Sequence, residues 1–230
     1  MKKRLILSCV VCLTALLPAF CQAEAQWKPT GNWPFVNQTF KVATVVSGYV
    51  TPKKTVVPCN IHVGNQTLWY AENDTLMEAL PGSILRVEFV DSTVYVPVPG
   101  NKFGKIIHED ERGRIINVKV VDYKKLKEDA RGRNLNAFTL DGGGLFPSIT
   151  IDMINSYDSR PEEQPVPIIN EYYFVVDKQL FKVTEKNIIN NLPPERKKEF
   201  RPFLRSAEII MENESSIMKI WKEFFAVKSL

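Results

Sequence analysis

A cysteine and a histidine lie three residues apart in the stretch VPCNIHV, residues 57–63. A thiol beside an imidazole is the starting material for a nucleophile–base pair, or for half of a metal site. The β-branched residues around them predict a strand, in which Cys59 and His62 point to opposite faces. Cys59 shares its face with Ile61 and Val63, so we interpret it as a small buried apolar side chain. His62 stays a candidate on the other face, without an assigned role.

Two further stretches contain polar side chains that could do chemistry. In HEDE, residues 108–111, an extended backbone places His108 and Asp110 on the same side. Two ligands are too few for a metal ion, and an exposed charged turn is favoured. Asp141 begins the run DGGG, which resembles a phosphate-binding loop in composition only. Leu-Phe-Pro follows it, where such a loop needs Lys-Ser/Thr and a helix.

The tryptophans Trp33 and Trp69 lie in the strand-rich part of the chain. Exposed aromatic rings on a sheet can stack on sugars or ring-shaped ligands, whereas buried rings fill a core. We favour packing for both. There is no Gly-x-Ser-x-Gly motif, and neither His62 nor His108 has the context of a catalytic triad. The sequence therefore predicts a protein that is not an enzyme, and it assigns no metal and no cofactor.

The N-terminus has the three zones of a signal peptide over residues 1–25. Lys2, Lys3 and Arg4 precede an apolar run over residues 5–17, and Ala-Glu-Ala at 23–25 fits a cleavage site. The apolar run is shorter than the roughly 20 residues of a membrane span, and no later segment approaches that length. We expect an exported protein without a membrane span, located in the periplasm, on the outer membrane or outside the cell.

Cleavage after residue 25 removes three of the four cysteines and leaves Cys59 alone, so no disulfide framework is expected. The full chain contains 30 basic and 26 acidic residues, and loss of Lys2, Lys3, Arg4 and Glu24 leaves 27 and 25. A charge balance this even gives no field that would attract nucleic acid. The stability of the mature chain must come from a packed core.

The elements that position these residues follow from two periodicities. LRVEF at 85–89 and IINVKV at 115–120 alternate apolar and polar residues, which predicts strands with one buried and one wet face. Asp91-Ser92 predicts a hairpin turn. Pro97 and Pro99 place the end of the following strand at an edge, because proline donates no ladder hydrogen bond.

The period becomes helical after a last hairpin that turns near Asp177-Lys178. Thr184 and Asn213 are expected to cap helices, and Pro193-Pro194 fits a first helical turn. Pro202 is expected to kink or end its helix just before it. The final helix has an apolar stripe, for which we favour burial in the core over a partner site: Ile217, Ile220, Trp221, Phe224 and Phe225.

The predicted fold class is α+β. An antiparallel β meander over residues 26–160, with a partly closed barrel as one form of it, follows the signal peptide. Residues 161–183 form a linker and a β-hairpin. Residues 184–230 form a small helical unit that packs on the β part.

Four stretches together resemble a group of exported Bacteroidetes proteins of about this length. They are VPCNIHVGNQTLWYAENDTLMEALPGSILRVEF, STVYVPVPGNKFGKIIHEDERGRIINVKVVDYKKL, YYFVVDKQLFKVTEKNIINNLPPERKKEF and AEIIMENESSIMKIWKEFF. The resemblance covers most of the mature chain and rests on strand and turn patterns. It implies an envelope setting, and it transfers no functional residue because the group has no assigned activity.

Three functions stay open at this point. The first is a non-catalytic envelope protein that binds another protein or an envelope polymer. The second is a carrier or sensor of a small apolar ligand in a curled-sheet cavity. The third is a hydrolase with an unrecognised site near Asp141 or His108, which requires those side chains to meet in one cleft.

Overall fold

The computed structural model describes residues 34–72, 75–80, 82–126 and 165–226. The predicted signal peptide, Trp33 and Asp141 lie outside this part of the chain. Ten strands in it form one antiparallel sheet in the order β10-β9-β8-β7-β6-β5-β1-β2-β3-β4. The strands are β1 Lys41–Ser47, β2 Lys53–His62, β3 Thr67–Glu72, β4 Thr75–Glu78, β5 Ile84–Phe89, β6 Val94–Val98, β7 Lys102–Asp110, β8 Gly113–Val121, β9 Ile168–Val176 and β10 Gln179–Lys182.

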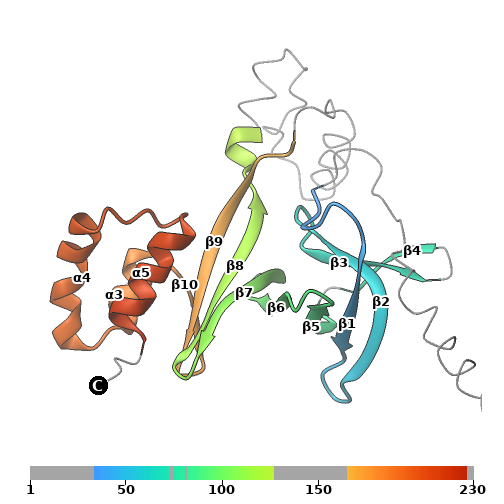
Figure 1. The fold of residues 1–230 in the computed structure, drawn as a ribbon, viewed down its shortest axis with the longest axis horizontal. Coiled ribbons are helices and arrows are strands. Elements are labelled where there is room, and N and C mark those ends of the chain that lie inside the picture. The colour runs from blue at the N-terminus through green and yellow to red at the C-terminus, as the bar shows by residue number, and fades with distance from the viewer. Residues whose placement is uncertain (1–33, 73–74, 81, 127–164, 227–230) are drawn as a thin grey trace, which may run out of the picture.

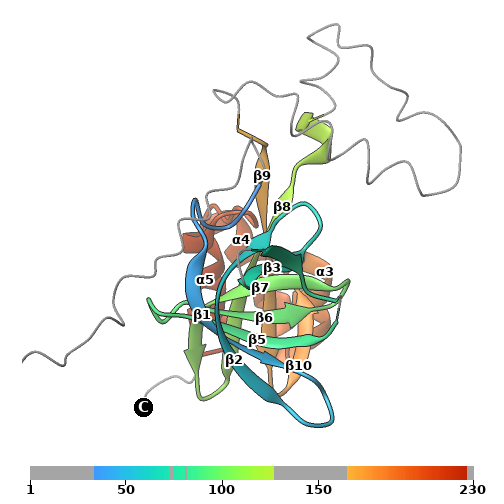
Figure 2. The ribbon, with the colours of Figure 1, turned by 90° about the vertical axis from the view of Figure 1, so that its right-hand side faces the viewer.

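The helices follow the sheet in the sequence, which confirms the α+β class. They are α3 Glu185–Asn191, α4 Pro194–Ser206 and α5 Glu214–Phe224. In Figure 1 the long paired strands β8 and β9 stand between the helices on one side and the N-terminal strands on the other. Figure 2 shows the strands crossing in front of the helices. The sheet curls strongly but does not close into a barrel.

Two predicted hairpin turns are confirmed. Ser92 takes a left-handed conformation with φ 63°, and its amide donates to the carbonyl of Phe89. Asp177 and Lys178 both have positive φ, 48° and 69°. Two consecutive left-handed residues give a turn whose twist matches the twist of the flanking strands. The β9–β10 hairpin belongs to the same sheet as the N-terminal strands.

Pro97 explains an irregularity inside the sheet. β6 pairs with β5 only at Val94 and Tyr95, whereas it pairs with β7 as far as Val98. Continuing the β5–β6 register would place Pro97 opposite Leu85, where its ring nitrogen has no hydrogen to donate. β6 is an inner strand by order, yet at Pro97 it is locally an edge, as the sequence predicted.

The helices begin where capping residues were expected. The side chain of Thr184 accepts from the amide of Asn187. Asn213 accepts from the amides of Ser215 and Ser216 at the start of α5. Pro193 and Pro194 open α4. These caps satisfy amides that have no partner within their own helix.

Pro202 was expected to kink or end its helix just before it, and the second of these is wrong, since α4 continues to Ser206. Pro202 and Lys198, one turn before it, are both exposed. The carbonyl of Lys198, which loses its amide donor at Pro202, therefore faces water rather than a dry core. Loss of one hydrogen bond at a hydrated position does not stop the helix.

The helical unit is held on the sheet by a shared apolar core. Ile115 of β8 and Phe174 of β9 contribute from the sheet, and Trp221 lies against Phe174 with ring centroids 5.1 Å apart. The predicted stripe of α5 is thus buried within the chain, and its members in this core are Ile217, Ile220, Trp221, Phe224 and Phe225. Helices and sheet form one packed body.

Candidate functional site

Cys59 and His62 do not form a pair. Cys59 lies in the inner core of the curled sheet with Ile61, and burial raises the pKa of its thiol to about 12. His62 points to the outer face, where its ring stacks on Trp69 and meets Phe35 edge-on. Burial lowers its pKa to about 4, and its Nδ1 accepts from the amide of Asn65 at 3.0 Å. The histidine is neutral near pH 7 and takes part in packing.

On the outer face beside His62, the side-chain amide of Asn60 holds the neighbouring backbone in place. The Asn60 side chain donates to the carbonyls of Asn37 and Thr39, and its Oδ1 accepts from the amide of Asn37. These bonds hold the segment before β1 across β2. Trp69 is half-buried beside this segment and donates its indole N–H to Thr67. The arrangement is that of a small structural core rather than a ring-stacking platform.

His108 and Asp110 do come together, with Nε2 and Oδ2 3.1 Å apart. The same Oδ2 accepts from Nε1 of Trp221 at 2.8 Å, and Oδ1 accepts from the amides of Arg112 and Gly113. Burial raises the pKa of Asp110, but the bonds from Trp221, His108 and the two amides lower it overall. This carboxylate anchors the β7–β8 turn to α5.

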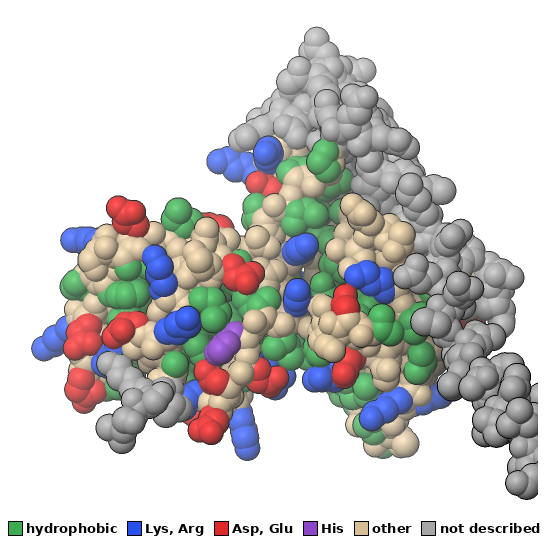
Figure 3. Space-filling view, viewed as in Figure 1, with side chains coloured by type: hydrophobic (Ala, Val, Ile, Leu, Met, Phe, Trp, Pro, Cys, Tyr) green, Lys and Arg blue, Asp and Glu red, His purple; other side chains and the backbone are tan. Residues whose placement is uncertain are grey.

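A groove of about 780 Å³ lies on the inner face of the curled sheet. It lies beside the helical unit. One wall is the start of α5, and the other is formed by the N-terminal strands. Figure 3 shows it as the hollow at the centre of the molecule, with basic side chains inside and acidic ones on both sides. Its polar lining includes Asn37, Lys41, Gln66, Asp91, Thr93, Tyr95, Lys105, Asn117, Lys119, Asn170, Tyr172, Glu212, Asn213 and Glu214.

The floor of the groove is a row of cross-strand partners. Tyr95 of β6 pairs with Lys105 of β7, Lys105 pairs with Asn117 of β8, and Asn117 pairs with Tyr172 of β9. Directly paired residues on antiparallel strands share a face, so the four side chains point into the groove together. We call Tyr95, Lys105, Asn117 and Tyr172 the polar row.

Each end of the polar row lies near a carboxylate. At one end, burial together with the charge of Asp91 raises the pKa of Tyr95 to about 12. At the other end, the pKa of Tyr172 is raised by burial and by the charge of Glu214, although a hydrogen bond from Asn117 lowers it. Both phenols are therefore protonated at neutral pH and can donate hydrogen bonds.

The lysines of the groove differ in what they contact. Lys41 forms an ion pair with Asp91, 3.1 Å from Nζ to Oδ2. The pKa of Asp91 is lowered to about 2 by hydrogen bonds from Thr93 and Lys41. Lys105 and Lys119 form no ion pair with any described residue and are exposed in the groove. They are the cations available to a bound group.

Gln66, through its side chain, joins two strands of the sheet beside the groove. It lies in the β2–β3 turn with φ 58°, and its Oε1 accepts from the amide of Phe103 while its Nε2 donates to the carbonyls of Lys119 and Val63. The β7–β8 ladder stops at Lys105 and Asn117, two positions before Phe103 would face Lys119. The Gln66 amide thus takes the place of a backbone group between the two strands.

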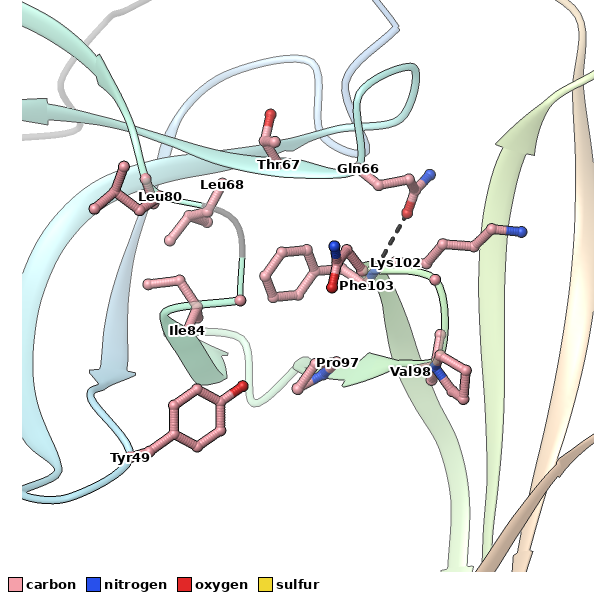
Figure 4. A pocket seen from close by; sticks show the side chains of 15 residues that line it. Tyr49, Gln66, Thr67, Leu68, Leu80, Ile84, Pro97, Val98, Lys102 and Phe103 are labelled. Atoms are coloured by element: carbon pink, nitrogen blue, oxygen red, sulfur yellow. Dashed lines mark hydrogen bonds between the residues drawn. The ribbon is translucent and has the colours of Figure 1, made fainter.

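A smaller pocket of about 230 Å³ opens where β5 and β6 separate at Pro97. Figure 4 shows Phe103 at its centre, with the Gln66 side chain above it and a dashed line from the Gln66 oxygen to the Phe103 amide. Its apolar lining includes Tyr49, Leu68, Leu80, Ile84, Pro97 and Val98. Gln66 and Phe103 also line the groove, so these two residues form the partition between the two hollows.

Sequence reasoning did not single out the polar row as a site. The alternation in IINVKV predicts Asn117 and Lys119 on one wet face, and both line the groove, but Asn117 is buried there. The partners on β6, β7 and β9 depend on register between strands distant in sequence. A polar residue on the wet face is common in any sheet, and only the register shows which ones meet.

Within the described residues, no group of three or more His, Cys, Asp or Glu is placed to hold a metal ion. None of the helices described is long and apolar enough to cross a membrane. Comparison of the chain with protein-family models, with curated proteins and with solved structures yields no match. Its function must therefore be argued from the groove.

Proposed function

We propose that this protein is a non-catalytic binding protein of the cell envelope and that the groove on its concave sheet face holds a polar ligand. The observation that supports this most strongly is the polar row, in which four strands contribute side chains to one continuous floor. Lysine, amide and phenol groups provide the oriented hydrogen bonds that fix a ligand.

The titration behaviour of the groove favours binding over catalysis. General acid–base catalysis works best with groups whose pKa lies near the working pH. In the groove the pKa of Asp91 is lowered to about 2, with the hydrogen bonds from Thr93 as the main cause. Burial raises that of Tyr95 to about 12. Neither group exchanges a proton easily near pH 7.

A polar ligand suits this surface better than an apolar one. The apolar interior beside the groove is filled by side chains of the sheet itself, including Val45, Ile61 and Val87. What stays open is lined mainly by polar groups, lysine, amide, phenol and carboxylate, with fewer apolar side chains between them. Placing an apolar molecule there would desolvate charged groups without replacing their hydrogen bonds.

The test is co-sedimentation of the purified mature protein with the insoluble envelope fraction of a Bacteroidetes bacterium. We expect the parent protein to sediment with this fraction, and the double variant Lys105→Glu/Lys119→Glu to lose most of that binding. The matched control is Lys53→Glu/Lys54→Glu, because both lysines are exposed at the start of β2, away from the groove.

Two results would contradict the proposal. One is sedimentation that is absent, or equal for the parent, groove and control proteins. The other is release of soluble fragments from the envelope fraction, detected by mass spectrometry, since that would indicate catalysis.

A further inference from the structure

The groove has opposite charges at separate places along its length. Lys105 and Lys119 extend from the floor on β7 and β8, whereas Glu212 and Glu214 line the wall at the start of α5. None of these four side chains forms an ion pair with another described residue. The groove therefore offers a cationic region and an anionic region that are both open to a ligand.

The separation of the two regions follows from the sheet. Lys105 lies on β7 and Lys119 on β8, whereas Tyr172, which feels the charge of Glu214, lies on β9. Neighbouring strands are about 4.8 Å apart, so the two regions are separated by about 5–10 Å at the floor. An extended polypeptide advances about 3.4 Å per residue, so about two or three residues span this distance.

We infer that the ligand is a short extended peptide with two free ends, its carboxylate at Lys105 and Lys119 and its ammonium group at Glu212 and Glu214. This inference rests on the proposed function and names the ligand class of the same groove. The carboxamides of Asn117 and Asn170 offer the donors and acceptors that peptide groups require.

A repeating acidic glycan fits the same surface less well. Its negative charges would meet Glu212 and Glu214 on one wall and Asp91 on the other. Like charges brought together at a binding surface disfavour such a partner. A neutral glycan would make no use of the two unpaired lysines. The charge pattern favours a zwitterion.

The experiment is isothermal titration calorimetry of the mature protein with four probes. They are trialanine with both ends free, N-acetyl-trialanine, trialanine amide and a short oligogalacturonate as the acidic glycan. We expect trialanine to bind and each blocked form to bind at least tenfold more weakly, because each loses one of the two ion pairs.

Variants assign each end of the peptide to its wall. Lys105→Ser/Lys119→Ser should remove the difference between trialanine and its amide, and Glu212→Gln/Glu214→Gln should remove the difference between trialanine and its acetylated form. Lys53→Ser/Lys54→Ser and Glu195→Gln are the matched controls, since these side chains are exposed outside the groove. The controls should leave all affinities unchanged.

Tighter binding of oligogalacturonate, or equal binding of the free and blocked peptides, would overturn the inference. If groove-dependent sedimentation persists while no peptide binds, the binding function stands and only the ligand class is wrong. If both experiments fail, the groove is not a binding site.

Discussion

Buried polar side chains define this protein more clearly than any catalytic motif. Asn60, His62 and Asn117 are all at least nine-tenths buried. Asn60 fixes the segment before β1, and Asn117 bonds to Tyr172 at the floor of the groove. A buried polar group is costly unless it is bonded, so each of these residues specifies one arrangement of the backbone around it.

His62 predicts a pH dependence of stability. Its folded-state pKa is lowered to about 4 by burial, below the usual value of 6.5. The neutral form is favoured in the folded state, so the stabilisation is complete above pH 6.5 and is lost as the pH falls toward 4. The total loss is about 3 kcal/mol. Urea unfolding between pH 7.5 and pH 4 measures it.

The matched variant for this prediction is His62→Asn, whose carbonyl oxygen can accept from the Asn65 amide in place of Nδ1. Its free energy of unfolding should change less over the same pH range. Parallel curves for the parent and the variant would show that other groups cause the dependence.

Gln66 predicts a local loss of stability. Gln66→Ala leaves the Phe103 amide and the Lys119 carbonyl without the side-chain amide that joins them. The loss of one or two such bonds lowers the free energy of unfolding by about 1–3 kcal/mol. Gln179→Ala on β10, an exposed position, is the control for denaturant unfolding. Equal midpoints for both variants would contradict a structural role for Gln66.

At the scale of elements, one carboxylate connects the sheet to the last helix. Asp110 closes the β7–β8 turn through two backbone amides and also accepts from Trp221 of α5. The apolar stripe of α5 directs the helix to the sheet, and the bond from Trp221 to Asp110 fixes the position of the helix along the sheet. Packing gives most of the energy, and the bond gives specificity.

The variant Trp221→Phe tests this connection. It keeps an aromatic ring against Phe174 but removes the indole N–H that donates to Asp110. A hydrogen bond to a charged group contributes about 2 kcal/mol, so the protection of the α5 amides from hydrogen exchange should fall by about 30-fold. Trp69→Phe is the control, because its N–H donates to the neutral Thr67 hydroxyl. Equal protection of α5 in both variants would rule out the connection.

The elements themselves were largely predictable from the sequence, because period, caps and turn residues act locally. Alternation identified the strands, and Thr184 and Asn213 marked the helix starts. The expectation that Pro202 could end its helix was wrong, because the outcome depends on whether the Lys198 carbonyl faces water, which a local pattern does not show. The groove could not be predicted, because Lys105, Asn117 and Tyr172 meet only through register.

At the scale of the whole molecule, sheet and helices share one core. Phe174 on β9 contacts Trp221 and Phe225, and Phe181 on β10 contacts both Phe174 and Phe225. Neither the helical unit nor the C-terminal strands can bury these rings alone. The helices therefore belong to the same cooperative unit as the sheet.

This shared core predicts a single unfolding transition. Far-UV circular dichroism, which follows helix and strand, and tryptophan fluorescence should give the same denaturant midpoint. After correction for each variant's own change in stability, the fluorescence midpoints of Trp69→Phe and Trp221→Phe should also agree. An early loss of helical signal, with the strands still folded, would mean that the helical unit is separable.

The strand order has a further consequence. Among the described strands, every neighbouring pair is consecutive in sequence except β1 and β5. The strands β1 to β4 therefore form one local meander and β5 to β10 another, and the β1–β5 ladder from Ala43 to Ser47 is the single pairing between them. Separating the two meanders therefore requires the loss of this one ladder, together with the bonds from Gln66 to Phe103 and Lys119.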